Sequence, residues 1–381
     1  MIHQLHVGTD FGDASSPADA VLRLSLDSDT GALSATGSPL KIGSNNPGWL
    51  SRYIQKGDNS IVYIAMETDP GAVQAFAVEK SNGELRPLGP SQSTQGRSPC
   101  YCSLDMSEKW LFVAHYSSGS VSVLPVLSDG RLGPVTDTKQ HPNDPSLFPV
   151  SLHDRQEGPH AHCILPHPIH PFVVVCDLGL SRVVVYRFDF DKGILIEVHV
   201  LQLAIGAGPR HCCWDRDNGD VLYIVNELNY TLVAASFDIT TGACTLPEAS
   251  SLFQPLYLLR DNDETSRAHH RGGSDIARLG RFLYVGCRAT DPGLIAIVDR
   301  ETWKVVGHES TRGAVPRNFK VIQSGGGKEE NKFFLVVGNQ ESKSVVSFMM
   351  NHTTGKLTFQ SRISTEPYKA CHIASPDAIV V

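Results

Sequence analysis

Four short motifs carry side chains that could do chemistry. They are GPHAH at 158–162, GPRH at 208–211, NEL at 226–228 and GCR at 286–288. Histidine takes up or releases a proton near neutral pH, and arginine holds a carboxylate or a phosphate with two parallel hydrogen bonds. A glutamate such as Glu227 can transfer a proton when partial desolvation raises its pKa. The motifs therefore favour proton transfer on a small anionic molecule.

Two other interpretations of these residues are open at the level of sequence. Glu227 and Arg210 can simply neutralise each other as a structural ion pair. His160 and His162 would point to the same face of a strand, as two metal ligands do. A third ligand at a fixed spacing is missing, however, and Arg210 nearby would repel a cation. We therefore predict neither a metal nor any other cofactor.

A sevenfold repeat shows which elements position these motifs. Seven apolar runs, spaced by 49 to 61 residues, each end in a small or polar pair. They cover residues 5–9, 62–67, 111–116, 173–177, 222–227, 283–288 and 335–340. A strand-built unit of about this length, repeated seven times, is typical of β-propeller blades. The alignment predicts a ring of residues around a central channel, made of Asp10, Glu67, Tyr116, Asp177, Glu227, Arg288 and Gln340.

The fifth copy shows the parts of one unit. Residues 208–215, 220–227 and 231–239 fit three strands, and a turn at 240–242 leads into a fourth. Four short strands with Gly-containing turns fit one antiparallel blade. We therefore predict an all-β fold, in which residues 1–381 form a single domain. This domain would be a seven-bladed β-propeller of four-stranded antiparallel blades.

Prolines mark the first strand of each unit and predict how the chain closes. The markers are Pro47, Pro99, Pro159, Pro209 and Pro316. Pro367 opens one more first strand near the C-terminus, whereas the chain begins with a second strand. The two ends are therefore expected to pair, which closes the ring and removes exposed sheet edges. Insertions are expected to form loops at 137–157, 261–271 and 324–331.

Composition excludes several classes of partner. The net charge of −7, without a dense basic patch, argues against nucleic acid and against an acidic membrane surface. No apolar run reaches the roughly 18 residues of a membrane span, and the first residues lack the pattern of a secretory signal. The nine cysteines fit free thiols in a reducing cytoplasm. The sequence gives no indication of an oligomeric state.

Several motifs resemble one known family. They are NPGWL at 46–50, GPHAH, GAGPRH at 206–211, NEL after LYIV, and RFLYVGCR at 281–288. Over nearly its whole length the chain resembles the seven-bladed propeller lactonases, which include bacterial-type 6-phosphogluconolactonases and the fungal 3-carboxy-cis,cis-muconate cyclase. By motif, the resemblance implies a site made of His162, Arg210, Glu227 and Arg288. The sixth repeat departs from the pattern, because residues 267–280 lack the usual Ser-Pro-Asp-Gly turn and add His and Arg residues.

The resemblance and the residues together predict a lactonase that hydrolyses a small anionic sugar lactone of the 6-phosphogluconolactone type. His162 would orient or deprotonate the attacking water. Arg210 and Arg288 would bind the anion and stabilise the oxyanion, and Glu227 would act as an acid or hold an arginine. Further substrate-binding candidates are His160, His211, Asp177 and Arg317.

Two alternative functions are open. One is a cycloisomerase that forms a lactone from carboxymuconate or a related polycarboxylate, because the same cationic site suits such a substrate. The other is a non-catalytic propeller that serves as a scaffold for protein interaction, since fold alone does not define activity.

Overall fold

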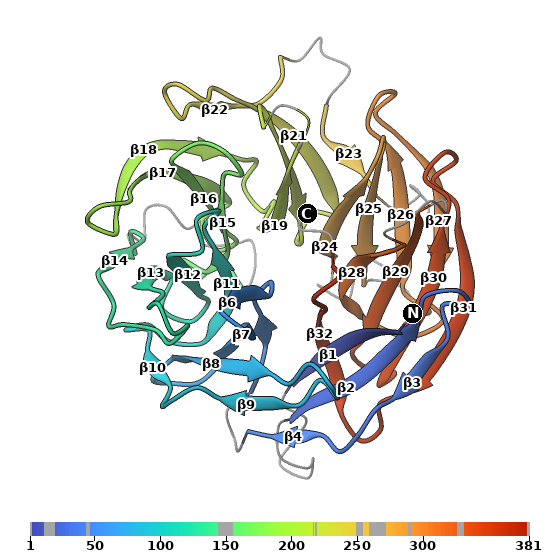
Figure 1. Cartoon of the computed structure of the whole chain (residues 1–381). Coiled ribbons are helices and arrows are strands. Elements are labelled where there is room, and N and C mark those ends of the chain that lie inside the picture. The colour runs from blue at the N-terminus through green and yellow to red at the C-terminus, as the bar shows by residue number, and fades with distance from the viewer. Residues whose placement is uncertain are drawn as a thin grey trace. The chain divides into compact units, whose positions relative to one another are not determined.

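The protein is built of β-strands throughout the described part of the chain. The computed structural model describes residues 2–10, 20–42, 46–143, 155–215, 217, 219–248, 254–258, 272–288, 291–325 and 331–378. Within these ranges there is no helix that could cross a membrane. The strands form seven antiparallel sheets that follow one another along the chain (Figure 1). The predictions of an all-β fold and of seven sheets are confirmed.

The chain divides into two compact units. Unit 1 comprises Met1–Tyr53, Val78–Arg86 and Leu258–Val381, and unit 2 comprises Ile54–Ala77 and Pro87–Tyr257. The prediction that residues 1–381 form one domain stays a prediction.

Unit 1 holds three sheets. The terminal sheet has the order β3-β2-β1-β32, with β4 also on β2; the next two sheets have the orders β24-β25-β26-β27 and β28-β29-β30-β31. The strands of the terminal sheet are β1 (Ile2–Asp10), β2 (Ala20–Asp27), β3 (Leu33–Ala35), β4 (Leu40–Lys41) and β32 (Lys369–Ala374). The others are β24 (Gly273–Leu279), β25 (Phe282–Cys287), β26 (Leu294–Asp299), β27 (Lys304–Ser310), β28 (Pro316–Ser324), β29 (Lys332–Asn339), β30 (Ser344–Met350) and β31 (Leu357–Ser364).

Unit 2 holds the sheets that matter for the site. Its strands are β6 (Ile54–Lys56), β7 (Asn59–Met66), β8 (Ala72–Val78), β10 (Gln92–Ser93), β11 (Pro99–Leu104), β12 (Trp110–His115), β13 (Ser120–Pro125), β14 (Asp137–Gln140), β15 (Ala161–Pro166), β16 (Phe172–Asp177), β17 (Arg182–Asp189), β18 (Ile194–Gln202), β19 (Pro209–Trp214), β20 (Val221–Asn226), β21 (Thr231–Phe237), β22 (Cys244–Thr245) and β23 (Leu256–Tyr257). The short strand β5 (Trp49–Leu50) belongs to unit 1, and the short strand β9 (Leu85–Pro87) starts in the Val78–Arg86 segment of unit 1. The third, fourth and fifth sheets of the chain are β11–β14, β15–β18 and β19–β23. We call these three the site sheets.

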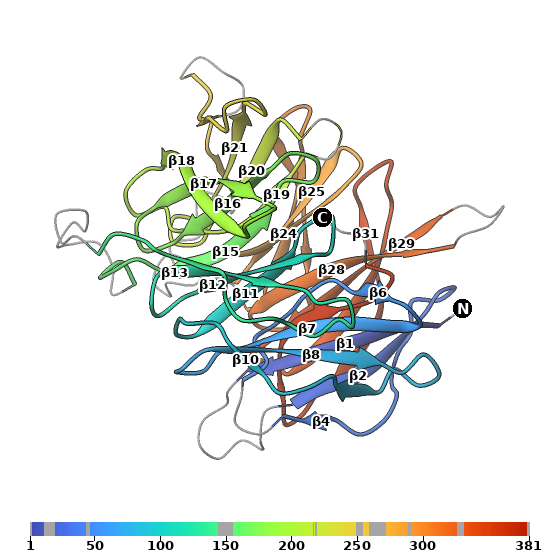
Figure 2. The same cartoon turned by 60° about the vertical axis from the view of Figure 1, so that its left-hand side comes forward.

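The inner strands form because they are short apolar runs rich in β-branched residues. Every residue of β16 is buried, so this strand is covered on both faces. Such a continuous apolar run between turns fits a core strand. The outer strand β18 instead leaves Ile196, Glu197 and Val198 exposed. Figure 2 shows the fourth sheet beside the fifth. The two sheets share a core that includes Phe172, Trp214 and Phe237.

The two ends of the chain pair in the terminal sheet. Strand β32 is antiparallel to β1, with His6 opposite Ala374 and Val7 opposite Ile373. Figure 1 shows the first strand in dark blue beside the last in red. The predicted pairing of the C-terminal segment with the N-terminal strand is confirmed. It leaves β1 covered on both sides by hydrogen-bonded neighbours.

A β-bulge recurs at the same place in the first strands. In the fifth sheet Pro209 lies opposite Asn226 and His211 opposite Val225, so Arg210 is the extra residue between them. The same register shift occurs in five sheets, and the extra residues are Cys100, His162, Arg210, Arg317 and Cys371. A bulge re-aims one side chain without ending the strand. The sheet register thus singles out one residue in each of these first strands.

The bulge corrects the repeat alignment in the fourth sheet. Ala161 pairs with Asp177 there, as Pro209 pairs with Asn226, so Ala161 rather than Pro159 corresponds to Pro209. Asp177 then corresponds to Asn226, and Leu178 holds the place of Glu227. The expectation that Asp177 belongs to the same ring as Glu227 is wrong, because the spacing of apolar runs does not reveal which residue is paired.

The three predicted insertion loops agree with the structure to different extents. The first four residues of the 137–157 insertion form the outer strand β14 rather than a loop, since they pair with β13. Residues 261–271 lie outside the described residues. Ser324 belongs to strand β28, so the third insertion begins one residue later than expected.

Candidate functional site

Three of the predicted catalytic residues meet between the fourth and fifth sheets. His162 and Arg210 are the bulge residues of β15 and β19, and Glu227 follows the last residue of β20. Arg210 Nη1 donates to His162 Nε2 at 2.7 Å and to Glu227 Oε2 at 2.7 Å. The bulges aim His162 and Arg210 at one another, and the backbone fixes Glu227, whose N–H donates to Gly208 O at 2.7 Å.

A second guanidinium binds the other oxygen of Glu227. Arg155 Nη1 donates to Glu227 Oε1, and Arg155 Nε donates to the Tyr116 hydroxyl at 3.1 Å. Glu227 has a side chain that is 0% exposed, so it needs such partners, because an unpaired buried carboxylate is strongly unfavourable. Motif analysis missed Arg155, which lies near the end of the 137–157 insertion, outside the repeat.

Two guanidiniums share the Glu227 carboxylate, and a second carboxylate, that of Glu157, lies 3.0 Å from His160. Arg210 is 5% exposed and Arg155 is 28% exposed, measured on the side chains. Charges interact more strongly in such surroundings than in bulk water, because the effective dielectric constant is lower. The cluster is therefore suited to attract a small anion.

His162 is neutral at physiological pH. Its burial, followed by the positive charge of Arg210 and the neighbouring His211, lowers the His162 pKa well below the usual value. The guanidinium of Arg210 can only donate, so His162 Nε2 accepts and the ring proton is on Nδ1. That nitrogen lies 3.8 Å from Cys100 Sγ. A neutral imidazole can act as a base once its Nε2 lone pair is released.

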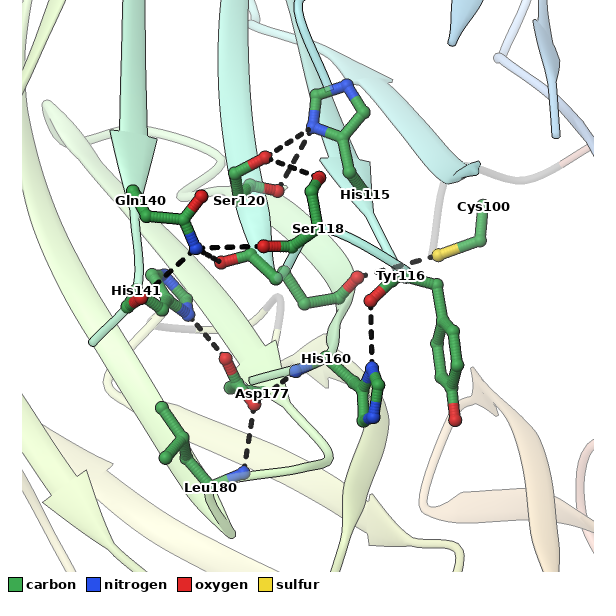
Figure 3. A network of polar contacts seen from close by, with 12 residues as sticks. Cys100, His115, Tyr116, Ser118, Ser120, Gln140, His141, His160, Asp177 and Leu180 are labelled. Carbon is green, nitrogen blue, oxygen red and sulfur yellow. Dashed lines mark hydrogen bonds and ion pairs between the residues drawn. The ribbon is translucent and has the colours of Figure 1, made fainter. Parts of the chain in front are cut away.

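Tyr116 and His160 form the next part of the site (Figure 3). Their rings are stacked, with centroids 4.3 Å apart and planes at 10°, and Figure 3 shows them side by side. His160 Nδ1 donates to the backbone oxygen of Tyr116 at 2.9 Å. Burial raises the pKa of Tyr116, and the positive charge of Arg155 opposes that rise. Tyr116 therefore presents a protonated hydroxyl to Arg155.

Asp177 binds the backbone next to the stacked rings of Tyr116 and His160. Its Oδ1 accepts from the N–H groups of His160 and Leu180, both at 2.9 Å, and its Oδ2 accepts from His141 Nδ1 at 2.5 Å (Figure 3). Asp177 is 0% exposed. These contacts favour a role in holding the backbone of the GPHAH segment over direct contact with a substrate.

The end of the 137–157 insertion is anchored beside His160. Gln156 is buried and donates to Leu178 O at 2.8 Å and to Ser181 Oγ at 2.9 Å. Glu157 Oε1 lies 3.0 Å from His160 Nε2, and the Glu157 side chain is 63% exposed. Arg155 and Glu157, on either side of this anchor, are therefore held at defined positions.

The remaining predicted residues lie around this cluster or in unit 1. The ring of His211 is edge-on to His162, with centroids 5.6 Å apart, and edge-on to Tyr101 at 5.4 Å. In unit 1, Arg288 follows β25 and its Nη2 donates to Gly273 O at 3.3 Å. Arg317 is the bulge residue of β28. That Arg288 and Arg317 act together with His162 stays a prediction.

The described residues contain no group of three or more His, Cys, Asp or Glu side chains that could hold a metal ion. All nine cysteines are buried free thiols.

Comparison with known proteins identifies the family. The family described as "Lactonase, 7-bladed beta-propeller" matches residues 5–372, so the chain belongs to it. Its fold class is accordingly the seven-bladed β-propeller, and it is an enzyme of the lactonase type.

Individual relatives cover almost the whole chain. The 6-phosphogluconolactonase of Bacillus subtilis is 30% identical over 358 residues, which are 93% of this chain and 94% of that one. A crystal structure of a protein from Lactobacillus plantarum superposes with a TM-score of 0.79 at 25% identity, covering 98% and 99% of the two chains. The periplasmic gluconolactonase of Pseudomonas aeruginosa has the same fold, with a TM-score of 0.79, 23% identity and coverage of 97% and 98%.

Proposed function

We propose that this protein hydrolyses a small anionic sugar lactone of the 6-phosphogluconolactone type, at the site made of His162, Arg210 and Glu227. The observation that carries the proposal is the buried cluster in which Arg210 donates to both His162 and Glu227. The Bacillus subtilis relative, named a 6-phosphogluconolactonase, supports this substrate class.

The proposed mechanism begins with a change of partner at Arg210. When the lactone carbonyl oxygen binds Arg210, the guanidinium releases the Nε2 lone pair of His162. His162 then takes a proton from water as the water oxygen bonds to the carbonyl carbon. Arg210 stabilises the resulting oxyanion, and Glu227 keeps Arg210 in place. The ring C–O bond then breaks, and His162 returns the proton to the leaving oxygen, which yields the open hydroxy acid.

The experiment is an assay of the full-length protein with 6-phosphogluconolactone, glucono-δ-lactone and carboxymuconate, with spontaneous hydrolysis subtracted. We expect the phosphorylated lactone to give the highest kcat/KM. Replacing His162 with Ala should lower kcat on the order of 10²–10⁴-fold with a smaller change in KM, since it removes a proton-transfer group. Turnover of carboxymuconate alone would assign the cycloisomerase instead, and no turnover of any of the three would favour the scaffold.

We further propose that the protein acts in the cytoplasm. The support is its nine buried free thiols, because exported proteins meet an oxidising environment. Fractionation of cells that produce the protein tests this proposal, and recovery from an exported fraction would contradict it.

A further inference from the structure

The two arginines that bind Glu227 are not equivalent. Arg210 is 5% exposed, and its Nη1 also donates to His162, so it lies inside the cluster. Arg155 is 28% exposed and comes from the insertion rather than from a sheet. An anion that approaches from solvent meets the guanidinium of Arg155 before that of Arg210.

Arg155 can also exchange its partner at a lower energetic cost than Arg210 can. If Arg155 turns from Glu227 to an anion, Glu227 keeps the 2.7 Å contact with Arg210. Arg210 can pass one N–H from His162 to a bound carbonyl oxygen while it stays on Glu227, but turning fully toward a distant anion would take a donor from both buried acceptors, which is more unfavourable.

The neighbours of Arg155 hold it in place. Gln156 anchors the adjacent backbone to Leu178 and Ser181, and Tyr116 receives the Nε hydrogen bond. The Tyr116 ring is itself stacked on His160. A long side chain that is already ordered loses less conformational entropy when it binds a ligand. Arg155 is therefore preorganised to bind a ligand, unlike a surface arginine that is held by one ion pair.

We propose that Arg155 is the anion-binding residue of this site and sets its preference for negatively charged substrates. Its guanidinium would bind the phosphate or carboxylate of the substrate through two charge-assisted hydrogen bonds. This inference rests on the proposed function for the identity of the substrate. It assigns a role to Arg155, which neither the repeat nor the motifs indicated.

Calorimetric titration with stable sugars tests the proposal on the full-length protein. The probes are glucose 6-phosphate, glucuronate and glucose, which share a sugar ring and differ in charge. Arg155→Gln should weaken binding of the preferred anionic probe about 10- to 100-fold, the range for a lost charge-assisted hydrogen bond, and leave glucose unchanged. Whichever anionic probe loses more affinity shows whether phosphate or carboxylate is the group recognised.

Two further variants make the result specific. Arg131→Gln removes an exposed arginine of unit 2 that pairs with Asp129, and it should leave all three affinities unchanged. Arg155→Lys keeps the charge next to Glu227 but loses the planar fork, so it should retain the fold and still bind the anion about three- to tenfold more weakly. If Arg155→Gln fails to fold, the anion affinity of Arg155→Lys tests the proposal instead.

Three outcomes would overturn the proposal. They are unchanged anion affinity in both Arg155 variants, an equal loss for glucose, and a wild-type protein that binds neither anion more tightly than glucose. If Arg155 governs anion binding but no lactone is hydrolysed, the proposed function fails and the binding role stands.

Discussion

A β-bulge occurs in the first strand of the fourth and fifth sheets and also in the terminal sheet, but the bulge residues have different surroundings. In β15 and β19 the bulge residues are His162 and Arg210, and they meet in a charged cluster. In β32 the bulge residue is Cys371, which is buried and apolar in character. The bulge therefore presents a side chain to a defined place, and the residue type decides whether that place does chemistry.

The histidines that follow the bulges show the same contrast. His211 comes after Arg210 and faces His162 across 5.6 Å. His372 comes after Cys371; its Nδ1 accepts from Leu50 N–H at 3.1 Å, and its ring lies 3.9 Å from Trp49. The terminal sheet thus uses its histidine to tie segments of unit 1 together.

The largest effect should come from breaking the terminal sheet. Deletion of residues 367–381 removes β32, exposes the edge of β1 and takes Ala370 and Ile373 out of the core of unit 1. We expect loss of the whole stability of the fold, about 5–15 kcal/mol, because a central ladder is removed. Circular dichroism during urea unfolding measures this. A synthetic peptide of residues 366–378 should restore the transition, and a deletion that unfolds at the wild-type midpoint would contradict the expectation.

A smaller but still large effect should follow from removing the carboxylate of the site. Glu227→Ala removes the buried carboxylate that binds both Arg155 and Arg210, so we expect a loss of about 3–5 kcal/mol in unfolding free energy. Hydrolysis of the lactone should fall below detection as well. The matched control is Glu341→Ala in unit 1, which removes a surface pair with Lys369 and should change stability by less than about 1 kcal/mol. Equal effects of the two variants would refute the contrast between the two regions.

Acid should destabilise both regions through buried neutral histidines. Burial lowers the pKa of His115, beside the site, and of His6, in β1, to about 4. Each histidine therefore binds a proton in the unfolded chain below its ordinary pKa but not in the folded chain. The contribution of each histidine to the free energy of unfolding is fully present above pH 6.5 and is lost as the pH drops toward 4. At pH 5 each should contribute a loss of about 2 kcal/mol.

Urea titrations at pH 7.5 and pH 5 measure this loss. The free energy of unfolding at pH 7.5 minus that at pH 5 should be about 2 kcal/mol smaller in His115→Gln and in His6→Gln than in the wild type, because glutamine does not titrate. An unchanged difference in both variants would show that the acid sensitivity arises elsewhere.

The smallest effect should come from Tyr116→Phe. This change removes the hydroxyl that accepts from Arg155 Nε and keeps the ring stacked on His160. We expect a loss of about 0.5–1.5 kcal/mol in anion binding, the usual contribution of one hydrogen bond. Titration with glucose 6-phosphate measures it. A loss as large as that of Arg155→Gln would mean that Tyr116, rather than Arg155, contacts the anion.

Much of the fold and part of the site could be predicted from the sequence. The apolar runs and Gly-containing turns gave seven sheets, and the unmatched first strand at Pro367 gave the pairing of β1 with β32. The motifs also gave the cluster of His162, Arg210 and Glu227. These predictions succeed because each repeat has a local pattern, so residues at equal positions in neighbouring repeats come close together in space.

The residues that the pattern missed owe their place to tertiary structure. A bulge adds one residue to a strand without changing its apolar pattern, so only the hydrogen-bonded register shows that Ala161, not Pro159, corresponds to Pro209. Arg155 has no repeat position at all, because it lies in an insertion. Only the folded chain brings it to Glu227 and Tyr116. The sequence by itself determined the strands, the family and the core of the site, whereas the tertiary structure decided which charges meet there.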